Sequence, residues 1–344
     1  MLENAGKTNI DQLGEFGLIE LLTSNIHLHH SSTIKGVGDD AAVIRGADKC
    51  TLISTDMLLE GIHFDLGYYP LKHLGYKSIV VNLSDICAMN AEPTHVTVSL
   101  GISSKFSVEA LEEIYSGMLM ACENYKIDLI GGDTSTSRQG LVINVTAIGE
   151  ADEKDIVYRS GAKVNDLLCV TGDLGGAYVG LQLLEREKRV FITNPSAQPE
   201  LEGNDYILER QLKPEARNDI IRLFKTMNIK PTSMIDISDG LSSEVFHLCS
   251  GSKTGMHLYE DKIPIDPMTY NVAREFNLDP TTCALNGGED YELLFTLSQT
   301  DYDKVKNHPD FTVIGYCTEA SEGVMMTSQA GNKHSLKAQG WKAF

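Results

Sequence analysis

The sequence predicts a mixed α/β (α+β) protein of two domains, and three observations support this prediction. The chain has 344 residues, which is enough for two hydrophobic cores. Its first half alternates short apolar runs with turns, as the hairpins of a sheet do. Residues 166–186 then read as a strand, a glycine-rich turn and a helix, the usual unit of an α/β domain. We expect an N-terminal domain of residues 1–150 and a C-terminal domain of residues 151–344.

Composition and charge exclude several classes of protein. No window reaches the roughly 18 apolar residues of a membrane helix, and the first residues lack the apolar core of a signal peptide. A net charge of −19 repels nucleic acid and anionic membranes, so we expect neither as a partner. The seven cysteines are scattered without a C-x-x-C pair. This usage suits a reducing cytoplasm and argues against a disulfide scaffold or a zinc site.

The first strong signal is a hairpin that follows an expected helix at residues 15–24. Residues 41–45 and 50–55 read as strands, and residues 46–49 as the turn between them. The simplest register pairs Arg45 with Cys50 across this turn.

That register predicts an acidic pair beyond the strands. If the pairing continues, Asp40 lies opposite Thr55 and Asp39 lies opposite Asp56. Like charges that face each other across a hairpin destabilise it. The pattern therefore favours a bound cation, and oxygen ligands without thiols indicate Mg²⁺ or Ca²⁺. For the hairpin alone, acidic residues at solvated strand ends are an equally good interpretation.

The next segments predict helices that frame a second acidic site. Residues 71–89 read as a helix whose apolar run is interrupted by polar residues that include Asp85. A strand is expected at residues 96–102. A helix capped by Ser107 follows and extends to Tyr125, with Tyr115 on its apolar stripe.

A glycine pair marks the end of the next expected strand. Residues 127–130 read as a buried strand that runs into Gly131-Gly132-Asp133-Thr134-Ser135. Two glycines let a backbone approach a ligand closely, and an aspartate followed by hydroxyls suits a metal–phosphate site.

Two further acidic segments lie in the second half. Asp236 and Asp239 stand where a short apolar strand ends and a helix begins, a position that favours a bound ion. Residues 286–292 carry two glycines and three acids before the strand at residues 293–297. Asp236 and Glu292, taken singly, could each be an ordinary surface acid. Because the same arrangement recurs four times, a functional origin is favoured over chance.

In this order, seven segments resemble the motifs of the thiamine-monophosphate kinase family. They are GVGDDAAV, STDMLLEGIHF, VNLSDICAMNAEP, IGGDTS, VTGDLGGA, DISDGL and GGEDYELLF. The resemblance covers the chain from about Glu15 to Phe344. Each motif alone is modest, whereas seven in the family's order are highly specific. The family's superfamily also contains aminoimidazole ribonucleotide synthetase, selenophosphate synthetase and the hydrogenase-maturation dehydratase.

The resemblance implies a fold and a reaction. The N-terminal domain would bind metal and ATP, and its mixed sheet would pair with that of a second subunit to form a barrel across a homodimer. The C-terminal α/β domain would complete the active site. The implied reaction transfers the γ-phosphoryl group of ATP to thiamine monophosphate, giving thiamine diphosphate with the help of several Mg²⁺ ions.

The resemblance also implies three sets of site residues. The family's metal-binding positions correspond to Asp39, Ser54, Thr55, Asp56, Asp85, Asp133, Asp236 and Asp239. Its nucleotide-binding positions correspond to Tyr115, Gly132, Asp133, Arg159 and Ser238. Its substrate-binding positions correspond to His63, Glu289 and Trp341. Near the C-terminus Ala343 stands where the family often has histidine.

The chemistry of the reaction agrees with these residue types. A protein of charge −19 needs metal ions to neutralise two phosphate-bearing substrates. The acceptor phosphate has a second pKa of about 6 and is already anionic at neutral pH, so we expect in-line transfer without a general base or a phosphoenzyme. The thiazolium ring is cationic, which suits Glu289 as a carboxylate partner and Trp341 as a cation–π partner. A C-terminal plug in the core is the alternative role for Trp341.

Two other functions compete with this one. A sister ATP-dependent synthetase is disfavoured because no cysteine precedes the first Gly-Asp-Asp, no cysteine ends the chain, and the synthetase's own glycine-rich signature is missing. A non-catalytic divalent-metal-binding protein is the alternative from a different class. The spacing of an EF-hand loop does not occur in the sequence.

Overall fold

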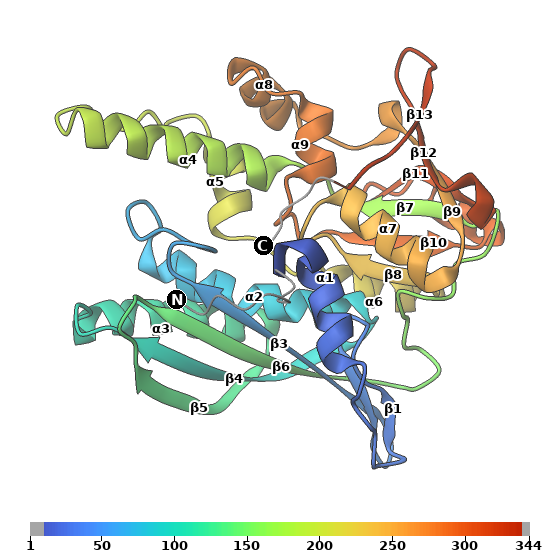
Figure 1. Ribbon diagram of the computed structural model, residues 1–344, viewed down its shortest axis with the longest axis horizontal. Helices are drawn as coiled ribbons and strands as arrows, with labels where there is room; N and C mark the ends of the chain where they lie inside the picture. The colour runs from blue at the N-terminus through green and yellow to red at the C-terminus, as the bar shows by residue number, and fades with distance from the viewer. Residues whose placement is uncertain (1–9, 339–344) are drawn as a thin grey trace, which may run out of the picture.

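The computed structural model describes residues 10–338, which form two sheets surrounded by helices (Figure 1). The first sheet has the strand order β1-β2-β3-β6-β4-β5 and the second the order β13-β12-β9-β11-β7-β10-β8. Neighbouring strands are antiparallel except for the parallel pairs β4–β5 and β9–β12. The predicted α/β class is therefore confirmed.

The first sheet and its helices come from the N-terminal half of the chain. The strands are β1 (Thr33–Lys35), β2 (Ala42–Arg45), β3 (Cys50–Leu59), β4 (Glu92–Ile102), β5 (Asp128–Thr136) and β6 (Val142–Ala151). The helices are α1 (Ile10–Thr23), α2 (Leu71–Ala88) and α3 (Val108–Tyr125).

The second sheet and its helices come from the C-terminal half. The strands are β7 (Leu167–Thr171), β8 (Ser233–Asp236), β9 (Gly255–Tyr259), β10 (Leu293–Leu297), β11 (Phe311–Thr318), β12 (Val324–Thr327) and β13 (Lys333–Ser335). The helices are α4 (Gly176–Thr193), α5 (Asp205–Leu212), α6 (Asn218–Met227), α7 (Leu241–Ser252), α8 (Pro267–Glu275), α9 (Pro280–Asn286) and α10 (Tyr302–Val305).

Only one face of the first sheet is covered by helices (Figure 1). Along β6 the side chains of Ile143, Val145 and Ala147 are buried, whereas the alternating Asn144 and Thr146 are partly exposed. This period of two is that of a strand with one face in the core. Helices α2 and α3 pack on the buried face, and the opposite face carries no helix among residues 10–338.

Helices α2 and α3 approach each other closely because each contributes a glycine to the contact. A Cβ atom on Gly75 would lie 1.9 Å from the carbonyl oxygen of Ile114, and one on Gly117 would lie 1.9 Å from that of Lys72. The predicted cap of α3 is confirmed, since the Ser107 hydroxyl accepts a hydrogen bond from the backbone N–H of Ala110.

Helix α2 is buried on nearly all sides because it also packs against the second half of the molecule. Fourteen of its 18 residues are buried, and one hydrophobic core continues from the first sheet through α2 to α6 and β10. A helix buried all round is normally apolar. The polar residues of α2 therefore need partners, and Lys77, Ser84 and Asp85 find them in the site described below. The division at residue 150 stays a prediction.

The structure confirms the register of the hairpin and corrects two other predictions. Arg45 pairs with Cys50, but the ladder ends at Ala42, so Asp39 and Asp40 do not face β3 across it. The glycine pair does not follow a buried strand, because Gly131 and Gly132 lie within β5, an exposed edge strand paired only with β4.

Candidate functional site

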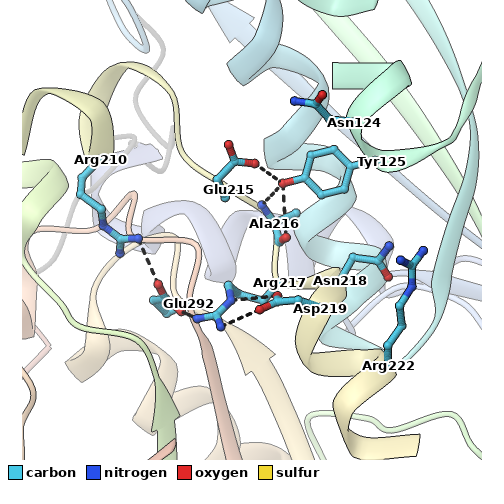
Figure 2. Close-up of a pocket in the computed structure, with 10 residues that line it drawn as sticks. All are labelled: Asn124, Tyr125, Arg210, Glu215, Ala216, Arg217, Asn218, Asp219, Arg222 and Glu292. Atoms are coloured by element: carbon cyan, nitrogen blue, oxygen red, sulfur yellow. Dashed lines mark hydrogen bonds and ion pairs between the residues drawn. The ribbon is translucent and has the colours of Figure 1, made fainter. Parts of the chain in front are cut away.

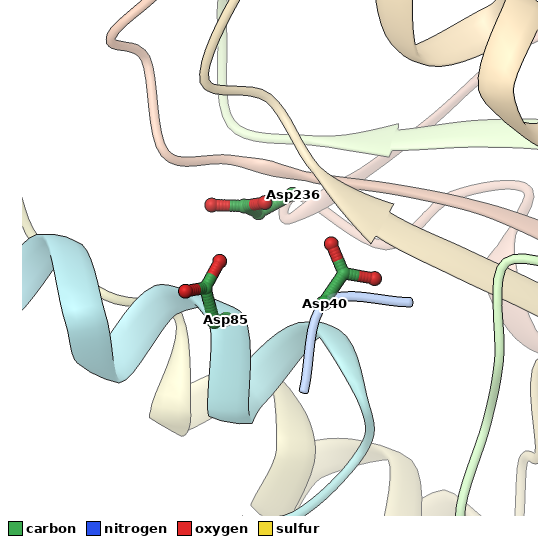
Figure 3. Close-up of side chains that lie close together, drawn as sticks. All are labelled: Asp40, Asp85 and Asp236. Carbon is green, nitrogen blue, oxygen red and sulfur yellow. The ribbon is translucent and has the colours of Figure 1, made fainter. Parts of the chain in front are cut away.

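Three aspartates from distant parts of the chain form one cluster, in which Asp40 and Asp236 are buried and Asp85 is partly buried (Figure 3). Asp40 lies in the loop before β2, Asp85 on the last turns of α2, and Asp236 at the end of β8. One carboxylate oxygen of each lies within 4.8 Å of the other two. Cationic or hydroxyl groups hold each carboxylate, but the cluster keeps an excess of negative charge.

The partners of the cluster come from both halves of the molecule. An Nη of Arg159 donates to Asp40 at 2.7 Å, and the Ser84 hydroxyl donates to Asp236 at 2.6 Å. The Ser54 hydroxyl donates to Asp85. Burial raises the pKa of all three carboxyls, and the negative charge of nearby aspartates raises each of these pKa values further.

Backbone hydrogen bonds of the loop after β8 position Asp236 and Asp239. The backbone N–H of Ile237 donates to the carbonyl of Glu292, which ties the loop after β8 to the start of β10. The backbone N–H groups of Ser238 and Asp239 donate to one carboxylate oxygen of the buried Glu244, at 3.2 and 2.8 Å. Burial raises the pKa of Asp239 to about 6.

The cluster opens into a cavity of about 750 Å³. The part of the lining next to the cluster consists of Asp56, Asp85, Asp236, Ser238 and Asp239. The remaining wall includes His63, Tyr68, Tyr69, Gln211, Glu289 and Tyr291. Carboxylates with oxygen ligands and aromatic and hydrogen-bonding groups thus line the same cavity. Such a cavity can hold a metal-bound phosphate and an organic ring together.

The loop that carries Glu289 is strained. Glu289 and Tyr291 have φ of 58° and 52°, in the left-handed region that non-glycine residues rarely adopt. Backbone hydrogen bonds from Glu289 to Ser238 (2.7 Å) and from Tyr291 to Ile237 (2.9 Å) hold this loop against the one after β8. A side chain on Gly288 would put its Cβ 2.5 Å from the carbonyl oxygen of Ser238, so this position needs glycine. Strain of this kind gathers at functional sites.

Most of the predicted site residues lie at the cluster or line the cavity. Asp39 lies beside the cluster, where it accepts a hydrogen bond from the backbone N–H of Arg159 at 3.0 Å and pairs with Lys35 at 3.3 Å. Thr55 lines the cavity, and its hydroxyl donates to the carbonyl of Val145.

Three of the residues predicted to bind nucleotide or metal lie away from the cavity. Gly132 and Asp133 are exposed on β5, and Tyr115 is on α3; none of them lines the cavity. Strands β6 and β4 separate β5 from β3, which puts β5 about 14 Å from Asp56 of β3 at the usual strand spacing. Trp341 and Ala343 lie outside the described residues.

Reasoning from the sequence missed three residues of the site. Asp40, rather than Asp39, enters the carboxylate cluster. The sequence does not distinguish Asp39 from Asp40 as the cluster residue, because the β2–β3 ladder ends at Ala42 and fixes the direction of neither side chain. Lys77 and Gln211 pair with Glu289, but neither belongs to a motif, and a single lysine or glutamine in a helix normally faces solvent.

Glu292 is not a surface acid, since it is 3% exposed beside a second cavity of about 460 Å³ (Figure 2). Its carboxylate accepts hydrogen bonds from Thr171, Arg210 and Arg217. This network joins β7, α5 and the start of α6 to β10. It fixes the segment that carries Gln211 into the larger cavity.

Comparison with known proteins identifies the class to which this fold and site belong. Residues 38–151 match the family model described as AIR synthase related protein, N-terminal domain. This match contains strands β2 to β6 of the first sheet, helices α2 and α3, and two of the three clustered aspartates. The chain therefore contains a domain of the AIR-synthase-related class.

Curated relatives specify the family within that class. The thiamine-monophosphate kinase of Bacillus subtilis is 34% identical over 341 residues, which cover 96% of this chain and 100% of that protein. The thiamine-monophosphate kinase of Aquifex aeolicus is 33% identical, covering 97% of this chain and 99% of that protein. The solved structure of AaThiL complexed with AMPPCP and TMP has a TM-score of 0.83 at 32% identity and covers 99% of this chain and 100% of its own. The chain belongs to the thiamine-monophosphate kinase family.

Proposed function

We propose that this protein transfers the γ-phosphoryl group of ATP to thiamine monophosphate, giving thiamine diphosphate. The observation that supports this most directly is the carboxylate cluster, which opens into a cavity that His63 and Glu289 also line. The related AaThiL, crystallised with AMPPCP and TMP, accommodates both kinds of substrate in the same fold.

Several Mg²⁺ ions are proposed as the metal, and the residues present fit them. Asp40, Asp85 and Asp236 offer oxygen ligands at short mutual distances, and Oδ2 of Asp40 is buried without a hydrogen-bond partner among the described residues. Asp39, Asp56 and Asp239 are the proposed additional ligands. When bound, Mg²⁺ would neutralise phosphate charge and polarise the phosphoryl group.

The chain's own residues would bind and orient the substrates. Arg159 holds Asp40 and adds a fixed positive charge beside the acids. Burial lowers the pKa of His63, so its imidazole is neutral at pH 7 and available as a hydrogen-bonding group. Because the acceptor phosphate is anionic at neutral pH, the proposed transfer is in line and uses no general base.

The proposal includes a homodimer formed through the bare face of the first sheet. Met57, Asn144, Ser99 and Asp133 lie in one ladder row across four strands of this sheet. A second subunit on this face would cover Asp133 and form the predicted barrel. Residues 1–150 and 151–344 are proposed as the two domains.

The proposed location is the cytoplasm. All seven cysteines are free and buried, as expected in a reducing compartment. No helix in residues 10–338 is both long and apolar enough to span a membrane.

The reaction is tested by measuring ADP and thiamine diphosphate together, with ATP, Mg²⁺ and either thiamine monophosphate or thiamine. We expect equal amounts of both products, only with the monophosphate and only with Mg²⁺. Asp85→Asn should lower kcat/KM by about 10²-fold or more because it removes one charged ligand of the cluster. Asp48→Asn, in the exposed turn between β2 and β3, is the matched control and should be unchanged.

Two outcomes would contradict the proposal. ATP turnover that ignores thiamine monophosphate would favour a sister synthetase of the same class. A folded protein that binds Mg²⁺ but neither nucleotide nor thiamine monophosphate would favour the non-catalytic metal-binding function.

A further inference from the structure

Lys77 is a buried cation beside the cavity, and the proposed reaction gives it no role. It lies in the middle of α2 and is only 1% exposed. Its ammonium group lies 2.9 Å from Oε1 of Glu289 and donates to the carbonyl oxygen of Gln211 at 3.1 Å. It also lies 5.6 Å from the ring centroid of Tyr69, within the range of a cation–π contact. A lysine is almost never fully buried unless it is paired, so this position depends on Glu289.

Gln211 holds the second oxygen of the same carboxylate. Its Nε2 donates to Oε2 of Glu289 at 2.9 Å, while its own Oε1 is buried without a partner among the described residues. The amide thus makes the hydrogen bond to Glu289 while its own oxygen stays unpaired, which indicates that the carboxylate determines the orientation of the amide. Both oxygens of Glu289 are therefore fixed in direction.

Buried contacts on several sides hold Gln211 in place behind Glu289. Gln211 is 2% exposed and ends α5, where the neighbouring Arg210 is bound to Glu292 (Figure 2). The hydroxyl of Tyr69 also donates to the backbone carbonyl of Gln211, at 3.0 Å. Movement of Glu289 toward a substrate charge would thus require several buried contacts to break.

Glu289 faces the cavity with its charge already balanced. Its side chain is 29% exposed, whereas that of Lys77 is 2% exposed, so a ligand meets the carboxylate and not the ammonium group. The two charges act in opposite directions on the pKa of His63, which Glu289 raises and Lys77 lowers. Each carboxylate oxygen keeps a free lone pair for a further donor. A cationic ring placed here would be repelled by Lys77 at close range, whereas a neutral N–H donor would not.

We infer that Lys77 is a positioning residue that makes Glu289 a charge-balanced hydrogen-bond acceptor for a neutral N–H donor of the substrate. In thiamine monophosphate this donor is the amino group of the aminopyrimidine ring, and not the thiazolium cation that the sequence suggested for Glu289. The inference rests on the proposed function, and it determines which half of the substrate enters this part of the cavity.

The test compares binding of thiamine monophosphate with binding of its analogue in which the pyrimidine amino group is replaced by a carbonyl. Calorimetry without ATP gives Kd for the wild type, Lys77→Met, Lys77→Arg and Glu289→Gln, and steady-state assays separate KM from kcat. We expect the wild type to prefer the amino compound by at least tenfold, because a carbonyl cannot donate to Glu289. Lys77→Met should weaken binding of thiamine monophosphate about tenfold and raise KM with little change in kcat, and Lys77→Arg should restore part of the loss.

Glu289→Gln keeps the inference testable if Lys77→Met fails to fold. An amide can donate as well as accept, so the preference for the amino compound should fall below threefold in this variant. Lys72→Met, in the first turn of α2 and outside the cavity lining, is the matched control and should bind as the wild type does.

Two results would overturn the inference. Tighter or unchanged binding of thiamine monophosphate by Lys77→Met would mean that Glu289 pairs with the thiazolium cation once it is freed from the lysine. A wild type that phosphorylates both compounds equally well would remove the amino group as the recognised feature and leave the proposed reaction intact. Failure of the proposed function would look different, since the wild type would bind neither compound.

Discussion

Arg159 shows at the scale of single residues how this site tolerates so many acids. Two unit charges 4.8 Å apart repel by about 3 kcal/mol at an effective dielectric constant of 20, and the cluster contains three such pairs. Arg159 offsets part of this repulsion through its ion pair with Asp40. Serine hydroxyls on the other two aspartates satisfy hydrogen bonds but add no positive charge. The cluster is therefore arranged to be completed by a divalent cation.

The same arginine acts on His247 of α7 and leads to a prediction about acid stability. Burial, and then the charge of Arg159, lower the pKa of His247 from 6.5 to about 4. Between these values the unfolded chain binds the proton and the folded chain does not, so stability is complete above pH 6.5 and is lost as pH falls toward 4. The loss from this group should reach about 2 kcal/mol at pH 5.

Urea unfolding of the wild type and His247→Gln at pH 7.5 and pH 5 measures this contribution. The variant loses the same packing at both pH values, but it has no proton to bind. Its free energy of unfolding should therefore fall less on acidification than that of the wild type. An equal fall in both proteins would mean that His247 titrates normally in the folded state.

Helix α2 is the element on which both halves of the site depend. It carries Lys77 to Glu289 and Asp85 to the carboxylate cluster, and it packs on α3 with no space between the two backbones. Displacing this helix would move both ends of the cavity at once.

Gly75→Ala tests this dependence. Alanine normally favours a helix over glycine by up to about 1 kcal/mol. Here the new Cβ would lie 1.9 Å from a backbone carbonyl oxygen of α3, which cannot turn away as a side chain could. We expect a net destabilisation of about 3 kcal/mol, measured by urea unfolding. Ser116→Ala, exposed on α3, should change stability by less than about 0.5 kcal/mol, and a stabilised Gly75→Ala would show that the helices can separate at no cost.

The helices, strands and turns were more predictable from the sequence than the contacts between residues far apart in the chain. The turn at residues 46–49 set the hairpin register, and Ser107 marked the start of α3, because both signals act within a few residues. Asp40 meets Arg159 more than a hundred residues away, and Lys77 meets Glu289 across the molecule. Such contacts depend on how elements pack, which local periodicity does not encode.

At the scale of the whole molecule, the bare face of the first sheet leads to the last prediction. This face presents Met57 of β3, which is 53% exposed, and Thr97 of β4, which is partly exposed between the buried Val96 and Val98. Three of the predicted site residues, Tyr115, Gly132 and Asp133, lie on β5 and α3 and not at the cavity. A second subunit on this face is a direct way for Gly132 and Asp133 to serve a site, and it also covers the edge strand β5.

Sedimentation equilibrium should therefore give twice the chain mass of 37.7 kDa. Thr97→Arg puts a charged side chain in the middle of the face, where burial without a partner is costly, so its dimer should dissociate at least tenfold more readily. Ile192→Glu, at the exposed end of α4, is the control and should remain dimeric. A wild type that is monomeric at micromolar concentration, yet phosphorylates thiamine monophosphate, would show that one chain completes the site alone. A Thr97→Arg dimer as tight as that of the wild type would place the interface on another surface.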